Sequence, residues 1–113
     1  MKTAPLQNRY WAKNANKDIY ILRLERNNKD LTQLKDRLSS YMVEPRTYSL
    51  FQQIEYLRNR MEYLRNTNQE ILSALKREPR KSFADIMDAI KRQFREFYEL
   101  QQGIDEYINV VRS

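Results

Sequence analysis

The sequence contains no histidine, no cysteine and a single glycine among its 113 residues. Without histidine, the chain lacks the commonest general base and the commonest metal ligand. Without cysteine, it can form no disulfide, thiolate metal site or cysteine nucleophile. One glycine cannot build a phosphate-binding GxGxxG turn or P-loop. We therefore expect no enzymatic activity, no metal and no organic cofactor; the i,i+3 carboxylate pairs Asp85/Asp88 and Glu96/Glu99 are most simply a solvated helix face.

Long hydrophobic runs are missing as well. The longest apolar run, residues 19–22, is far shorter than the roughly 20 apolar residues that a membrane-spanning helix requires. We therefore expect no membrane span. The N-terminus has no apolar core of the kind found in a secretory signal peptide. These features predict a soluble intracellular protein in the cytoplasm, and they leave a nuclear or mitochondrial location open.

A heptad repeat of apolar residues dominates the middle of the chain. The pentapeptide EYLRN occurs at residues 55–59 and again, seven residues later, at residues 62–66. Around it, apolar residues recur at alternating steps of four and three, so one face of a helix returns to the same partner surface every two turns. This seam consists of Leu50, Ile54, Leu57, Met61, Leu64, Asn68, Ile71 and Leu75.

The same spacing occurs on both sides of this central segment, and it predicts two further amphipathic helices. Continued upstream in register, the first of them reaches Leu6, so its start could lie well before residue 17. The N-terminal seam consists of Tyr20, Leu24, Asn27, Leu31, Leu34, Leu38 and Tyr41, and the C-terminal seam of Phe83, Met87, Ile90, Phe94, Phe97, Gln101, Ile104, Ile108 and Val111.

Two prolines, Pro45 and Pro79, separate the three heptad segments. Proline disfavours helix in the residue before it, so each marks a joint. Short joints between long helices make neighbouring helices antiparallel. We expect an all-α fold, an antiparallel three-helix bundle over residues 17–113, preceded by a basic aromatic segment, residues 1–16, that could continue the first helix. The alternative is a helical hairpin or coiled coil completed by a partner chain. The expected helices span residues 17–42, 47–77 and 83–111.

The charges disfavour one mode of self-association. In the central heptads Arg60 is at position g and Arg65 at position e, so a parallel homodimer through residues 47–77 would bring these arginines together. Asn68 at position a acts in the opposite direction, because a buried asparagine can specify a parallel dimer. Other forms of self-association remain open.

Positive charge is concentrated in the first two thirds of the chain. Residues 1–46 carry a net charge of +5, residues 47–81 of +3 and residues 82–113 of −2. The last helix is thus the acidic one. If it folds back on the central helix, we expect Arg58 to lie near Gln102 and within about one helical turn of Glu99 and Asp105, and Arg65 near Glu96.

The unmatched arginines and lysines are interleaved with aromatic residues, which are typical anchors of protein interfaces. We therefore expect a non-catalytic helical adaptor or structural subunit that docks within a larger protein assembly, on an acidic partner surface. The alternative is a nucleic-acid-binding protein, since arginine and aromatic side chains also bind phosphates and stack on bases. The predicted contact residues are Arg9, Tyr10, Trp11, Lys13 and Lys17 in the N-terminal part, and Tyr56, Arg60 and Tyr63 on the central helix.

Overall fold

A computed structural model describes the backbone of residues 4–77 and 83–113 and the side chains of residues 17–77 and 86–113. Within these ranges the chain is helical, with no strand, which confirms the predicted all-α class. The elements are α1 (Ala4–Leu38), the short 3-10 helix η1 (Tyr41–Val43), α2 (Tyr48–Arg77) and α3 (Phe83–Arg112).

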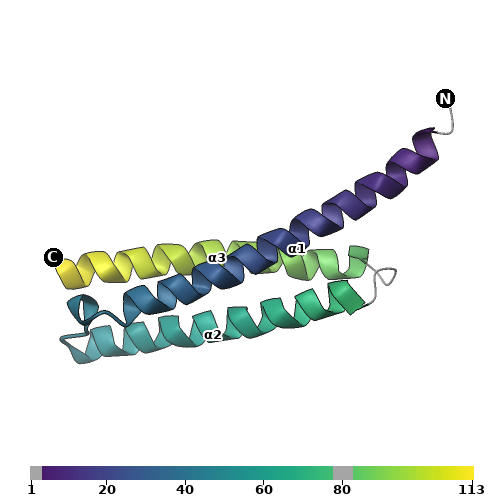
Figure 1. Ribbon diagram of the computed structural model, residues 1–113. Helices are drawn as coiled ribbons and strands as arrows, with labels where there is room; N and C mark the ends of the chain where they lie inside the picture. The colour runs from purple at the N-terminus through teal and green to yellow at the C-terminus, as the bar shows by residue number, and fades with distance from the viewer. Residues whose placement is uncertain (1–3, 78–82) are drawn as a thin grey trace.

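The three helices pack as an antiparallel bundle, as the heptad seams predict (Figure 1). Helices α2 and α3 lie side by side along their length, and the C-terminal half of α1 packs against both. The N-terminal part of α1, purple in Figure 1, continues beyond the ends of the other two helices. Helix α1 begins at Ala4, so the segment of residues 1–16 continues the first helix, which is the upstream extension that the register of the N-terminal seam allowed.

The first joint differs in detail from the prediction. Helix α1 ends at Leu38, not near residue 42, and η1 follows, with the Ser40 hydroxyl accepting a hydrogen bond from the Met42 amide at 3.2 Å. Because the helix stops four residues early, Tyr41 leaves the predicted seam and is 78% exposed. Val43 is buried in its place. The second predicted joint, at Pro79, lies outside the described residues, between the end of α2 and the start of α3.

A layer of three amides divides the interior. Asn68 of α2 donates from Nδ2 to Oδ1 of Asn28 on α1 at 2.9 Å. Gln93 of α3 donates from Nε2 to Oδ1 of Asn68 at 2.7 Å and to the Leu64 carbonyl at 3.2 Å. Asn68 and Gln93 are only 2% and 3% exposed. Each helix thus contributes one amide, and every buried side-chain polar atom in the described part of the chain has a partner.

Apolar clusters lie on both sides of this layer. The cluster toward η1 is larger and contains Leu31, Leu57 and Ile104, among others. The second cluster centres on Leu24, Leu75 and Ile90. Of the polar residues predicted on the seams, Asn68 alone is buried, while Asn27 and Gln101 are half-buried. The amides that complete the layer, Asn28 and Gln93, lie beside the predicted seams.

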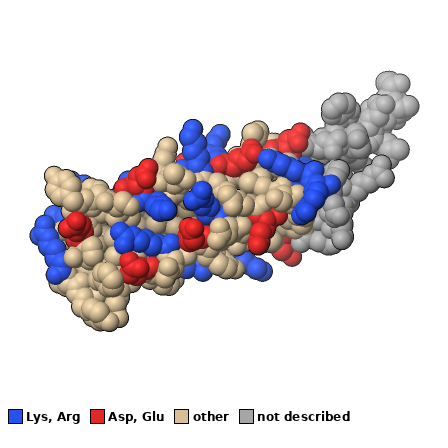
Figure 2. Space-filling view, turned by 60° about the horizontal axis from the view of Figure 1, so that its bottom comes forward, with Lys and Arg blue, Asp and Glu red and all other residues tan. Residues whose placement is uncertain are grey.

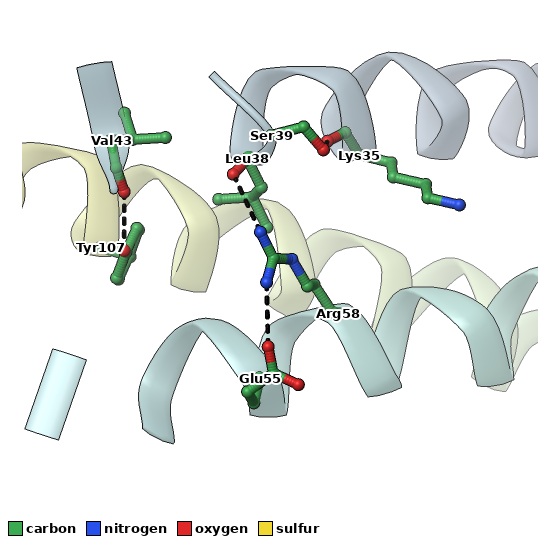
Figure 3. Close-up of polar contacts among 7 residues, drawn as sticks. All are labelled: Lys35, Leu38, Ser39, Val43, Glu55, Arg58 and Tyr107. Atoms are coloured by element: carbon green, nitrogen blue, oxygen red, sulfur yellow. Dashed lines mark hydrogen bonds and ion pairs between the residues drawn. The ribbon is translucent and has the colours of Figure 1, made fainter. Parts of the chain in front are cut away.

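Tyr107 ties the first joint to α3. Its ring is fully buried, and its hydroxyl donates to the Val43 carbonyl at 2.7 Å (Figure 3). Burial raises the pKa of the Tyr107 phenol above its ordinary value of 10.0, although the Arg58 guanidinium acts in the opposite direction. The neutral phenol is therefore the form that the folded bundle stabilises.

We expect Tyr107→Phe to lower the free energy of unfolding by about 1 kcal/mol near neutral pH, because the Val43 carbonyl loses its donor. A raised folded-state pKa contributes stability that is complete below the unfolded pKa and is lost as pH rises through the folded pKa. The advantage of the wild type over Tyr107→Phe should therefore shrink above about pH 10. Urea unfolding of both proteins at several pH values measures this difference in the free energy of unfolding. A difference that does not change with pH would contradict the burial argument.

Candidate protein-docking surfaces

Of the five predicted contact residues in the N-terminal part, only Lys17 has a described side chain. The side chains of Arg9, Tyr10, Trp11 and Lys13 lie outside the described residues, and only their helical backbone is defined. Lys17 is described and is half-buried on α1. The predicted roles of these five residues in binding protein or nucleic acid stay predictions.

The predicted contact residues of the central helix form a row along α2 on the side of α3. Tyr56 and Tyr63 are 63% and 56% exposed. Arg60, between them, forms an ion pair with Glu96 of α3, and its guanidinium carbon lies 5.1 Å from the centre of the Tyr63 ring. Arg60 is thus held in place by α3 and half-buried, and it is not an unpaired cation available to a partner.

A shallow groove of about 140 Å³ runs between α2 and α3 beside this row. At Gly103 the two helices approach closely: a β-carbon there would lie 3.2 Å from Cδ2 of Leu57. The groove holds one guanidinium, that of Arg60, and two carboxylates, those of Glu96 and Glu99. Glu99 forms no ion pair with any described residue. The groove is therefore net negative, which suits neither an acidic partner nor a phosphate.

The ion pairs between helices differ from the predicted ones. Glu96 pairs with Arg60 and not with Arg65. Asp105 pairs with Arg37 of α1 at 3.5 Å and not with Arg58. Neither Arg58 nor Arg65 thus forms an ion pair with an acidic residue of α3 among the described residues, because α3 packs against α1 as well as α2 and its carboxylates pair with both helices.

Arg58 of α2 makes its contacts inside the bundle, beside the C-terminal end of α1. It pairs with Glu55 on its own helix at 2.9 Å and donates to the Leu38 carbonyl at 3.5 Å (Figure 3). The guanidinium thereby satisfies one of the carbonyls that the last turn of α1 leaves without an intrahelical donor. In the same view the Lys35 side chain extends away from these contacts.

A larger groove, of about 310 Å³, lies between α1 and α2. Apolar side chains, Leu31 of α1 and Met61 of α2, form part of its lining. Lys35 and Arg65 line it too, and neither forms an ion pair among the described residues. Sequence reasoning did not find this groove, because its two sides come from segments about 25 residues apart whose register only the folded bundle defines. Its remaining lining residues are Thr32, Glu55, Arg58, Asn59 and Glu62.

Sequence reasoning also did not find a set of exposed apolar side chains near the first joint. Tyr41 and Met42 of η1, and Tyr48 and Phe51 of α2, are all about half exposed or more. At the left end of Figure 2, where η1 and the C-terminus lie in Figure 1, two areas of uncharged residues flank a few charged ones. For Tyr48 and Phe51 the sequence did carry a signal of exposure, because both residues lie off the heptad seam.

Charges of both signs alternate over the rest of the face seen in Figure 2, with no large area of one sign. Over residues 17–77 and 86–113, lysine and arginine outnumber aspartate and glutamate by 16 to 13. Half of the net charge of +6 therefore belongs to residues whose side chains are not described. Within the bundle, the sign of the charge differs from groove to groove and does not define one basic face.

The described residues contain no group of three or more His, Cys, Asp or Glu side chains placed to hold a metal ion. None of the helices, as far as they are described, is both long and apolar enough to cross a membrane. Comparison of the chain with protein-family models, with curated proteins and with solved structures finds no match.

Proposed function

We propose that this protein is a non-catalytic helical subunit that docks within a larger protein assembly. The observation that carries the proposal is the row Tyr56, Arg60 and Tyr63 on α2. Its two tyrosine rings are more than half exposed, although the bundle has a well-buried interior in which further aromatic side chains are accommodated. Tyrosine and arginine are the residue types that most often anchor protein interfaces.

Arg60 and Tyr63, two of the three members of the row, are also preorganised. Glu96 holds Arg60, Arg60 lies against the Tyr63 ring, and both tyrosines project from the middle of a long helix. Side chains held in this way lose less conformational entropy when a partner binds than side chains on a loop. The row therefore supports binding through aromatic contact area, with Arg60 serving to position Tyr63.

We expect the double variant Tyr56→Ser/Tyr63→Ser to lose its partner while keeping the fold. Loss of two interface anchors should weaken binding by about 1,000-fold, since each anchor contributes about 2 kcal/mol. The measurement is quantitative mass spectrometry of proteins that co-purify with the tagged chain from its native source.

Tyr98→Ser is the matched control, because Tyr98 is similarly exposed but lies on α3. It should retain the partner at the wild-type level, and circular dichroism should show the same helix content for all three proteins. Partners retained in full by the double variant would show that the row is not the docking surface. A chain that exists in its source only as a free monomer would contradict the assembly role itself.

A further inference from the structure

The groove between α1 and α2 combines apolar lining with cations that have no ion-pair partner among the described residues. Leu31 and Met61 contribute apolar atoms, Lys35 stands on the α1 side and Arg65 on the α2 side. The volume of about 310 Å³ is at the lower end of the range for binding pockets, about 300–1,000 Å³. Such a groove has room for a few side chains of a partner, while the partner backbone would lie along the rims.

The charge of this groove is positive once internal pairs are subtracted. Arg58 is neutralised by Glu55 and also donates to a backbone carbonyl. Lys35 and Arg65 then face a single remaining carboxylate, that of Glu62, which forms no ion pair within the described part of the chain. The α2/α3 groove has the opposite sign. The two sides of α2 therefore suit partners of opposite charge.

The shape of the groove favours a helix as its occupant. It lies between two antiparallel helices, so an added helix can insert apolar residues at i, i+3 and i+4 and become the fourth member of the bundle. Acidic residues on both flanks of that apolar stripe would meet Lys35 on one rim and Arg65 on the other. Complementary charge at the rims sets orientation and speeds association, while apolar contact contributes most of the affinity.

We infer that the α1/α2 groove binds an acidic amphipathic helix of the partner protein. This inference rests on the proposed docking function and names the chemistry of the partner. It places the acidic contact expected from the sequence in this groove, and not on the Tyr56–Tyr63 row. The row and the groove flank α2 on different sides, so one partner could contact the row while its acidic helix lies in the groove.

The test uses the full chain and two synthetic peptides. The first is an amphipathic helical peptide with leucines on one face and glutamates on both flanks; the second replaces every glutamate by lysine. Binding is measured by fluorescence anisotropy at low and physiological salt. We expect the acidic peptide to bind and the basic peptide to bind at least about tenfold more weakly, with affinity for the acidic peptide falling as salt is raised.

Three variants distinguish binding in the groove from nonspecific attraction of the acidic peptide by the net positive charge of the protein. Arg65→Glu and Lys35→Glu each reverse the charge on one rim of the groove. We expect each to weaken binding of the acidic peptide by about tenfold. Lys91→Glu makes the same change in net charge on the exposed surface of α3, away from the groove, and should change affinity by less than about twofold. Circular dichroism confirms that all three variants stay folded.

The inference is wrong if the acidic peptide does not bind at low salt, if both peptides bind equally, or if Lys91→Glu weakens binding as much as the groove variants do. Its failure is distinguishable from failure of the proposed function. Peptide binding that requires Arg65 supports the groove even if the chain has no partner in its source. A co-purifying partner that Arg65→Glu and Lys35→Glu do not affect would leave the assembly role standing and overturn the groove.

Discussion

Replacing Leu57 by aspartate is expected to abolish the folded bundle. Leu57 is 4% exposed, lies in the larger apolar cluster and touches the point where Gly103 brings α3 close to α2. Removing the side chain alone costs about 2–5 kcal/mol, and an unpaired carboxylate in the same place costs several more. The sum approaches or exceeds the total stability of about 5–15 kcal/mol that a small domain has.

The adjacent variant Asn59→Asp is a matched control, because it adds the same charge at an exposed position of the same helix. Far-UV circular dichroism and urea unfolding should show a native transition for Asn59→Asp and none for Leu57→Asp. A cooperative transition of wild-type midpoint in Leu57→Asp would mean that the core is not where α2 and α3 meet. Phe94→Asp should be milder, since Phe94 is half-buried and the Arg23 guanidinium carbon lies 4.1 Å from its ring centre.

Replacing Asn68 by leucine is expected to lower the free energy of unfolding by about 1–3 kcal/mol, even though an apolar residue enters the core. Asn68 is the central member of the amide layer: it donates to Asn28 and accepts from Gln93. Without it, Gln93 keeps only the Leu64 carbonyl as a partner, in a site that is 3% exposed. The expected loss of stability comes from the Gln93 amide, which stays buried without Asn68 as a partner, and not from the removal of the Asn68 side chain itself.

The double variant Asn68→Leu/Gln93→Leu separates this explanation from simple misfit of leucine. It removes both buried amides and leaves Asn28, which is half-buried and can reach water. Apolar replacement of a whole buried polar group is often neutral or stabilising. We therefore expect the double variant to regain most of the stability lost in Asn68→Leu, as measured by urea unfolding of both single variants and the double. Losses that simply add would contradict coupling through the layer.

The central helix was the most predictable part of the fold. Of the eight seam positions predicted from the heptad spacing, seven are buried and Leu50 is half-buried. A helix that packs on its neighbours through one stripe must repeat apolar residues at alternating steps of four and three, so the stripe is visible in the sequence before any partner is known. Pro45 likewise marks a joint through local sterics, since the residue before it, Glu44, is extended.

The third helix was less predictable because it packs against two neighbours. Beside the predicted seam it buries Gln93, Leu100 and Tyr107, which form a second stripe displaced by about one residue. A single heptad seam describes one contact surface, so the width of the buried face depends on where α1 lies relative to α3. Only the tertiary structure shows that Tyr107 reaches the Val43 carbonyl, 64 residues away.

By itself, the sequence determined the all-α class, the α2 seam and the absence of the residues that most catalytic and metal sites need. It also identified Tyr56, Arg60 and Tyr63 as a row, because i, i+4 and i+7 share one face of any helix. The tertiary structure decided which charges are free. Arg60 is neutralised by Glu96, whereas Lys35 and Arg65 line the α1/α2 groove without ion-pair partners among the described residues. These differences arise from the rotation and register of packed helices, which depend on side-chain interdigitation along the whole interface and not on any local pattern.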